Sequence, residues 1–144
     1  MKVFDLDGTI RNCRSPWNKL RDNSKFGIIR FLTGQIAALT AKKVNINLPK
    51  ENFLTITGSP SNENFISNLW LKINGINTKL LANPFVNRLL NENKPTDKKS
   101  GNWKNAILQY ITNFEKKITF YEDNLEQMKY IKNIKVKIKR IKNE

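Results

Sequence analysis

Short apolar runs that read as strands alternate with segments of helical periodicity along most of this 144-residue chain. The inner runs are continuously apolar, which is typical of strands buried on both faces of a parallel sheet. Parallel neighbours need crossover connections, and the helical segments between the runs can supply them. The sequence therefore predicts an α/β fold with a mainly parallel five-stranded sheet, with strands at 3–6, 52–59, 78–84, 117–124 and 134–141.

Three segments between these runs carry apolar residues at three- and four-residue spacings, the periodicity of amphipathic helices. The second has strong boundary signals, because Ser59 is a candidate N-cap, Pro60 suits the first helical position and Gly75 suits the exit. The third is expected to turn its larger apolar side chains inward, among them Tyr110 and Phe114. Helices are therefore expected at 25–43, 59–75 and 102–114, with a short one at 124–132 and loops at 8–23 and 85–101.

The chain is strongly basic: 26 Lys and Arg stand against 12 Asp and Glu, a formal net charge of +14. Such an excess favours polyanionic partners, chiefly nucleic acid. AT-rich coding also enriches Lys, but it would enrich Glu as well, and Glu is not enriched. A functional basic surface is therefore the favoured explanation.

Scarce residue types exclude several classes of site. The chain has no histidine, which excludes His-based acid–base catalysis, His metal sites and His phosphotransfer. Cys13 is the one cysteine, so no internal disulfide forms, and Lys19 stands where a Cys-based phosphatase loop needs Arg. The strand pattern begins at once and no apolar run is long enough to span a bilayer. We therefore expect one cytoplasmic domain over residues 1–144 with no membrane partner.

Polar side chains end several of the expected strands. Asp5 and Asp7 end the first, Thr57 the second, and Glu122 and Asp123 the fourth. Ligands of open parallel sheets bind at the carboxyl ends of the strands, so these side chains are expected to converge. Carboxylates from two strands suit Mg²⁺, which shields charge while one carboxylate attacks phosphorus and a second acts as acid and base. A lysine and a hydroxyl would hold the phosphoryl group.

The order of these residues resembles the haloacid dehalogenase (HAD) superfamily of phosphohydrolases. "FDLDGTI" fits its first motif, Asp-x-Asp-x-Thr after a buried strand, and implies that Asp5 is the nucleophile and Asp7 the general acid/base. "LTITG" supplies the hydroxyl of the second motif, Thr57. The resemblance extends from residue 5 to residue 123. It implies a Rossmann-like three-layer sandwich and a Mg²⁺-dependent phosphatase.

The third and fourth motifs leave alternatives open. Lys104 in "GNWKNAIL" fits the third, a Lys near the start of a later helix, with Lys98 and Lys99 as rivals in the preceding loop. "ITFYEDN" supplies the acidic pair of the fourth, which departs from the commoner Asp-Asp because Glu122 stands first. We therefore expect Asp123 to be the nearer metal residue, with Glu122 as the second candidate. The expected metal set is Asp5, Asp7, Glu122 and Asp123.

Many HAD members carry a cap domain over the site, but neither 8–51 nor 61–101 is expected to fold one. An open site encloses a small metabolite poorly and can admit the end of a polymer. The chain also resembles small HAD domains linked with RNA repair, called Swiss Army Knife RNA repair-like. A more distant likeness, through "FDLDGTI" and "ITGS", is to the phosphatase half of polynucleotide kinase-phosphatases. These likenesses imply removal of a terminal phosphate from DNA or RNA.

Four further residues are candidate substrate contacts under this interpretation. Gly58 and Ser59 belong to "ITGS", although Ser59 is equally a candidate helix cap. Arg11 and Arg14 are expected to meet the nucleic acid backbone, together with the basic loop at 94–99. Two alternatives stay open: a phosphatase of nucleotides or sugar phosphates, and a non-catalytic nucleic-acid-binding module on a HAD fold.

Overall fold

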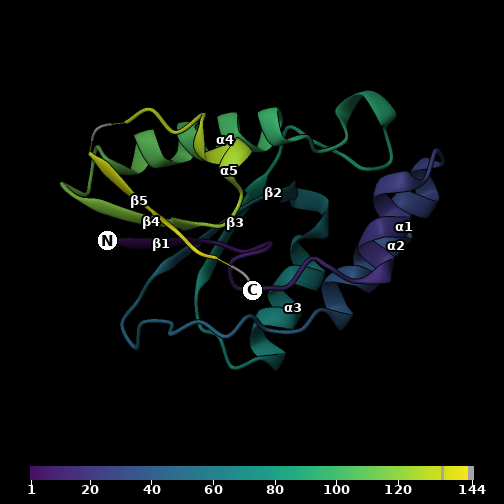
Figure 1. Ribbon diagram of the computed structural model, residues 1–144, viewed down its shortest axis with the longest axis horizontal. Helices are drawn as coiled ribbons and strands as arrows, with labels where there is room; N and C mark the ends of the chain where they lie inside the picture. The colour runs from purple at the N-terminus through teal and green to yellow at the C-terminus, as the bar shows by residue number, and fades with distance from the viewer. Residues whose placement is uncertain (134, 143–144) are drawn as a thin grey trace.

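The chain folds into three layers, with one sheet between two sets of helices (Figure 1). The computed structural model describes residues 1–133 and 135–142. The sheet is parallel throughout, in the spatial order β3-β2-β1-β4-β5, which confirms the predicted α/β class and the parallel five-stranded sheet. The strands are β1 (Lys2–Asp5), β2 (Leu54–Pro60), β3 (Lys79–Asn83), β4 (Ile118–Glu122) and β5 (Val136–Arg140).

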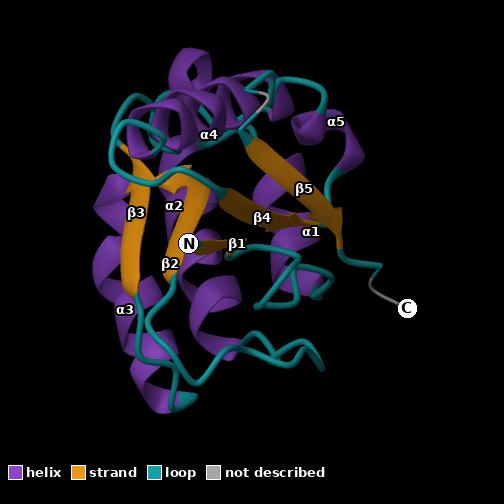
Figure 2. Ribbon diagram, turned by 90° about the vertical axis from the view of Figure 1, so that its left-hand side faces the viewer, coloured by secondary structure: helices purple, strands orange, loops and turns teal. Residues whose placement is uncertain are grey.

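Helices α4 and α5 cover one face of the sheet and α3 covers the other, while α1 and α2 pack together to one side (Figures 1 and 2). Within the described residues, no helix is both long and apolar enough to cross a membrane. The helices are α1 (Pro16–Asn23), α2 (Gly27–Thr40), α3 (Asn64–Ile73), α4 (Asp97–Ile111) and α5 (Leu125–Met128), with 3-10 turns η1 (Ser61–Glu63) and η2 (Asn91–Asn93).

Two apolar clusters hold the layers together, one on each face of the sheet. On one face, Phe4 packs with Trp70 and Leu71 of α3. On the other, Val3 packs with Leu108 of α4. Successive side chains of a strand point to opposite faces, so the neighbours Val3 and Phe4 enter different clusters. Burial on both faces explains why the inner strands are continuous apolar runs.

The register of β1 with its two neighbours sets the strand ends side by side. Asp5 is level with the residue before Thr57 on β2. The residue before Asp5 is level with Tyr121 on β4. Glu122 therefore ends β4 directly beside Asp5, and the polar strand ends meet at one edge of the sheet.

Residues 8–23, expected to form a loop, contain helix α1. The Ser15 hydroxyl accepts a hydrogen bond from the backbone N–H of Asn18, whose side chain accepts one from the N–H of Ser15. Pro16 occupies the first helical position. The Ser-Pro signal of a helix start is thus present at 15–16 as well as at 59–60, and it marks a real helix start at 15–16.

The helix predicted to begin at Ser59 begins instead at Asn64, after the 3-10 turn η1. Ser59 belongs to β2, which continues as far as Pro60. Its hydroxyl donates to Asp7 and does not cap a helix. The predicted exit is confirmed, because Gly75 follows α3 with a φ of +65°, a left-handed conformation that favours glycine.

Helix α4 begins earlier than the predicted residue 102. The hydroxyl of Thr96 accepts a hydrogen bond from a backbone N–H of the first turn and caps the helix, which starts at Asp97. Two side chains that were expected to face inward, Tyr110 and Phe114, are exposed instead. The buried face of α4 includes Lys104, a charged residue that apolar periodicity does not place there.

Strand β5 lies at the edge of the sheet, as its alternation of apolar residues with Lys predicts. Val136 is buried, whereas Lys137 and Lys139 are exposed. The first residue of the predicted strand, Ile134, lies outside the described residues.

Helix α2 lies within the predicted segment 25–43, but its larger apolar residues do not form its buried face. The buried face carries small or polar side chains, including Arg30, Thr33 and Gly34. Leu32 and Ile28 are more than half exposed. The Arg30 guanidinium donates to three backbone carbonyl oxygens, and these bonds anchor the helix where apolar packing is expected.

We expect two leucines in different helices to respond differently to truncation. Leu71 of α3 is 2% exposed, whereas Leu32 of α2 is 52% exposed. Leu71→Ala should lower the free energy of unfolding by about 2–5 kcal/mol, because it removes buried methyl groups and leaves a cavity. Leu32→Ala should lower it by less than about 1 kcal/mol. Urea unfolding measures both, and equal losses would contradict the assignment of the buried face of α2.

Candidate active site

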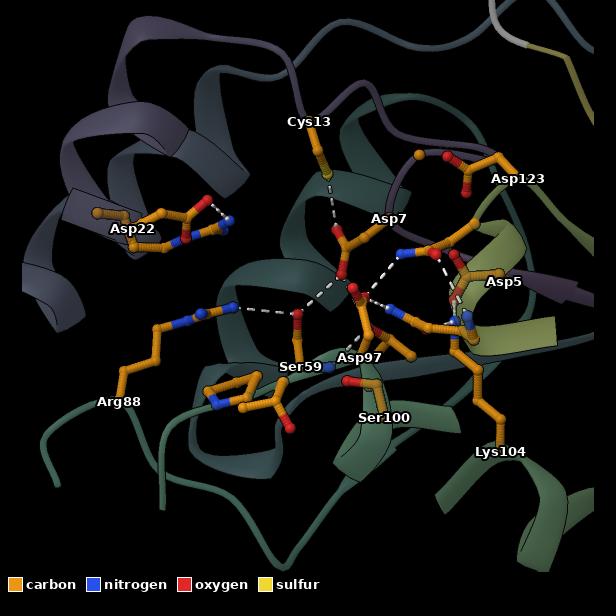
Figure 3. Close-up of a pocket in the computed structure, with 18 residues that line it drawn as sticks. Asp5, Asp7, Cys13, Asp22, Ser59, Arg88, Asp97, Ser100, Lys104 and Asp123 are labelled. Atoms are coloured by element: carbon orange, nitrogen blue, oxygen red, sulfur yellow. Dashed lines mark hydrogen bonds and ion pairs between the residues drawn. The ribbon is translucent and has the colours of Figure 1, made fainter. Parts of the chain in front are cut away.

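The carboxyl ends of β1, β2 and β4 open into a pocket of about 440 Å³ (Figure 3). This is the edge at which parallel sheets bind their ligands, and the volume lies within the range of small-molecule sites. The structure therefore brings together side chains that are far apart in the sequence. The predicted site residues that line the pocket are Asp5, Asp7, Thr57, Gly58, Ser59, Lys104 and Asp123.

Deep in the pocket, one buried lysine is shared between two buried carboxylates. Lys104 Nζ lies 2.7 Å from Asp5 Oδ1 and donates to Glu122 Oε2 and to Gln127 Oε1, each at 2.6 Å. Lys104 is 2% exposed and Asp5 is 1% exposed. Burial disfavours the charged lysine, but the two carboxylates outweigh this effect and raise the pKa of Lys104 above its ordinary value. Lys104 is therefore a permanent counter-charge for Asp5.

One carboxylate oxygen of Asp5 has no partner. Oδ2 is buried, yet none of the residues that the structure describes donates a hydrogen bond to it. Burial and the charge of Glu122 raise the pKa of Asp5, while Lys104 opposes them. A buried acceptor without a donor is costly, so this oxygen marks a place for a ligand that the chain itself does not supply.

Asp5, Glu122 and Asp123 each place one oxygen within 4.8 Å of the others. Glu122 is otherwise engaged, because Oε1 accepts two backbone N–H groups and Oε2 accepts from Lys104. Asp123 Oδ1 accepts a hydrogen bond from Thr9 Oγ1 at 3.2 Å. Burial, with the charge of Glu122, raises the pKa of Asp123 to about 6. This geometry favours Asp123 over Glu122 as the partner of Asp5 for a cation.

Asp123 reaches this position because residue 8 is a glycine. Gly8 has a φ of +92°, which residues with a Cβ rarely adopt, and a Cβ there would overlap the carboxylate of Asp123. The next residue, Thr9, donates to the same carboxylate. The Gly-Thr pair that follows Asp7 thus has a structural role: it makes room for Asp123 and holds it.

Asp7, the remaining residue of the expected metal set, is not part of this carboxylate cluster. Its Oδ1 accepts from Arg11 Nε at 2.8 Å and Nη2 at 2.6 Å. Its Oδ2 accepts from Thr57 Oγ1 at 2.7 Å and Ser59 Oγ at 2.8 Å. Burial works against the charged form, but Arg11 and these hydrogen bonds outweigh it and hold the pKa of Asp7 well below its ordinary value. Asp7 is an ionised acceptor fixed by these four contacts and by a longer one from Cys13 Sγ to Oδ1, at 3.5 Å.

Arg11 is buried in the structure, so the expected contact with a nucleic acid backbone does not fit its position. Besides holding Asp7, its Nη1 donates to Ser67 Oγ, and its Cζ lies 5.7 Å from the ring centroid of Trp70. Arg11 is therefore a positioning residue for Asp7. Arg14, by contrast, is exposed and lines a second hollow beside the pocket.

Of the three candidate lysines, Lys104 is the one that contacts Asp5. Lys98 is exposed, and the ammonium group of Lys99 donates to the backbone carbonyl of Glu92. Both rivals lie in the first turn of α4, whereas Lys104 lies further along the helix and not near its start.

Two arginines of the pocket were not predicted from the sequence. Arg88 follows β3 in a stretch expected to be a basic loop, and Arg21 belongs to the unpredicted helix α1. The Ser-Pro signal at 15–16 could have revealed the helix that carries Arg21. No local signal marks Arg88, whose partner Glu63 comes from a different segment. Because α1 lines the pocket, the site is bounded on a side that was expected to be open.

Comparison with known proteins assigns no family to the chain. No protein-family model matches the chain, and no match was found among curated proteins or solved structures. A function for the chain must therefore be argued from its own residues.

The donor set of the pocket suits a hard divalent cation. Asp5 offers an oxygen without a partner, and the Asp123 carboxylate lies beside it. When Asp5, Glu122 and Asp123 are ionised, they face one ammonium group, that of Lys104, so the cluster carries an excess of negative charge. Mg²⁺ is typically bound by one or two carboxylates together with waters and phosphate oxygens, and the residues present fit that requirement.

Lys104→Met should destabilise the fold strongly. The substitution leaves Asp5 and Glu122 buried without their counter-charge, and breaking a buried ion pair in this way costs about 3–5 kcal/mol. Lys98→Met, in the same helix but exposed, should change the free energy of unfolding by less than about 0.5 kcal/mol. Urea unfolding of the two variants measures the difference, and similar values would contradict the shared-lysine arrangement.

The deficit of Lys104→Met should grow as the pH rises. An unfolded chain ionises Asp with a pKa near 3.9, whereas burial raises the pKa of the folded Asp5. Lys104 opposes this rise in the unsubstituted chain, so its removal should raise the pKa of the folded Asp5 further. A carboxyl group with a raised folded-state pKa loses stability as the pH climbs from the unfolded value through the folded one. Unfolding free energies measured between about pH 5 and pH 8, relative to the unsubstituted chain, test this sign. A deficit that shrinks with rising pH would contradict it.

Proposed function

We propose that this chain is a Mg²⁺-dependent phosphomonoesterase in which Asp5 is the nucleophile, and that it removes a terminal phosphate from a nucleic acid. The observation that carries the proposal is the position of Asp5 and the partners of its two carboxylate oxygens. It lines the pocket at the end of β1, is paired with Lys104 through one oxygen and has no hydrogen-bond donor for the other among the described residues. The resemblance to the HAD motifs supports the same role.

The residues around Asp5 would orient it for attack on phosphorus. Lys104 fixes one carboxylate oxygen by an ion pair and limits rotation of the group. Asp5 and Asp123 would hold Mg²⁺, which when bound supplies positive charge that reduces the repulsion between the carboxylate and the phosphoryl oxygens. The hydroxyls of Thr57 and Ser59 lie in the same pocket as donors for those oxygens.

The proposed reaction has two steps. In the first, an oxygen of Asp5 forms a bond to phosphorus while the bond from phosphorus to the ester oxygen breaks, and the leaving oxygen takes up a proton. In the second, water gives up a proton and attacks the aspartyl phosphate, which releases inorganic phosphate and restores Asp5. One group that donates a proton in the first step and accepts one in the second would complete the cycle.

Asp7 is the group proposed for these proton transfers. Its present hydrogen bonds stabilise its ionised form, which suits the step in which water gives up a proton. A bound phosphoryl group offers Thr57 and Ser59 alternative acceptors. Each hydroxyl that turns away from Asp7 raises the pKa of Asp7 and brings it closer to a working acid. Arg11 holds the carboxylate in place throughout.

A second hollow beside the pocket supports a polymeric substrate. It shares Cys13 and Asp22 with the pocket and is lined by Arg14 and Lys19. A substrate longer than a mononucleotide would meet these basic side chains as it leaves the pocket. Burial and the charge of nearby Asp7 raise the pKa of the Cys13 thiol, so the thiol does not compete with Asp5 as a nucleophile.

Asp5→Asn should abolish Mg²⁺-dependent phosphate release. The amide is nearly isosteric but lacks the nucleophilic oxygen, so we expect turnover to fall at least about 1,000-fold. The measurement is phosphate release from 3′- and 5′-phosphorylated oligonucleotides and from a mononucleotide, with and without Mg²⁺. Glu51→Gln, an equivalent change at an exposed carboxylate, is the matched control and should keep full activity. Undiminished activity of Asp5→Asn would sink the proposal, and nucleic acid binding without turnover in the native chain would support the non-catalytic alternative.

Salt should distinguish a polymeric substrate from a small one. If basic side chains neutralise several phosphates of a bound strand, kcat/KM on an oligonucleotide should fall steeply between about 50 and 200 mM salt, by more than about tenfold. A mononucleotide engages fewer charges and should lose much less. A flat response on both substrates, or a preference for the mononucleotide, would favour the small-molecule phosphatase.

A further inference from the structure

Arg88 and Arg21 have no part in the chemistry described above, yet both line the pocket that contains Asp5. In Figure 3, Arg88 lies on the opposite side of the pocket from Asp5 and Asp123, and it points toward Ser59, which lies between them. The pocket therefore has a carboxylate side, where a cation fits, and an arginine side.

Arg88 has the arrangement of a preorganised anion-binding side chain. It is 8% exposed, its Nε donates to Glu63 Oε1 at 2.6 Å, and its Nη2 lies 3.4 Å from Ser59 Oγ. A guanidinium carries five N–H donors, and among the described residues these contacts engage two of them. The buried carboxylate of Glu63 holds the guanidinium in place, with one end directed at the pocket.

Arg21 reaches the same pocket from α1. Its guanidinium pairs with the neighbouring Asp22, whose side chain is largely exposed. The Arg21 side chain is 17% exposed and the Asp22 side chain is 60% exposed, so water competes for the carboxylate end of the pair and a phosphate can take its place beside the guanidinium. Two arginines from different segments thus border one part of the pocket.

We infer that Arg88 and Arg21 form a second anion subsite, which holds a phosphate other than the one that is removed. The subsite rests on the proposed phosphatase activity and deepens it. The phosphate to be removed belongs beside Asp5, and the pocket has room for a larger ligand. Arginine forks match phosphate oxygens in pairs, which makes a phosphate the fitting occupant of the arginine side. The substrate class is therefore a phosphomonoester that carries a second phosphate.

The test compares substrates with one and two phosphates. For the native chain with Mg²⁺, we expect kcat/KM to be about 10- to 100-fold higher for adenosine 3′,5′-bisphosphate or for a dinucleotide with one terminal phosphate than for adenosine 3′- and 5′-monophosphates. The bisphosphate offers a second monoester and the dinucleotide offers an internal diester. The arm that shows the preference identifies the source of the second phosphate.

Two variants assign that preference to the arginines. Arg21→Gln removes one charge, and Arg88→Lys keeps a cation beside Glu63 but removes the fork. Each should reduce the preference several-fold, mainly by raising KM for the substrates with two phosphates. Because every variant is compared on both substrate types, a general loss of folded protein cancels from the ratio. Lys79→Gln, at an exposed position at the start of β3 and thus at the opposite edge of the sheet, is the control that should keep the full preference.

Equal efficiency of the native chain on mono- and bisphosphates, or a preference that survives both arginine substitutions, overturns the subsite. If the native chain releases phosphate from none of these substrates, the phosphatase proposal fails, and binding decides the subsite separately. Calorimetric titration without Mg²⁺ should then give tighter binding of the bisphosphate than of the monophosphates, a difference that Arg21→Gln reduces. Equal Kd values overturn it.

Discussion

The ammonium group of Lys104 is the contact on which the rest of the site depends. It bonds Asp5 of β1, Glu122 of β4 and Gln127 of α5 from a position on α4, so four elements meet at one charge. Without it, the two carboxylates that end neighbouring strands would be buried with like charge side by side. The lysine therefore allows the sheet edge to carry the buried carboxylate that is proposed as the nucleophile, and it fixes how α4 lies against that edge.

Close backbone approach is the second requirement of the site. A Cβ at Gly8 would overlap the Asp123 carboxylate, and one at Gly58 would overlap the Ser100 side chain of α4. Both glycines follow residues that line the pocket, Asp7 and Thr57. Each glycine is therefore required by close packing. Gly8 leaves room for the end of β4 beside the end of β1, and Gly58 leaves room for the first turns of α4 beside the end of β2.

The sequence predicted those parts of the fold and site that depend on local pattern. Buried parallel strands produce continuous apolar runs, so the sheet and the convergence of its polar ends could be foreseen. Sequence signals for helix starts and buried helix faces gave wrong predictions where contacts between distant segments decide the outcome. Ser15-Pro16 and Ser59-Pro60 carry the same helix-start signal, but Ser59 bonds Asp7 and stays in β2. Periodicity located α2 but not its buried face, because Arg30 on that face bonds the distant Arg88 carbonyl as well as the two carbonyls just before the helix. Arg88 likewise depends on a distant partner, Glu63.

The distribution of charge constrains the order in which the cation and the substrate bind in the proposed reaction. The chain carries a net charge of +14, which draws polyanions toward its surface. The pocket itself has the opposite balance, because it is lined by five aspartates and only three basic side chains. A phosphate that arrives at the carboxylate side meets Asp5 and Asp123, and it is repelled until a cation neutralises them. The cation must therefore occupy the carboxylate side before the phosphate to be removed can settle beside Asp5. The arginine side, whose charges favour an anion without any metal, can engage the rest of the substrate first.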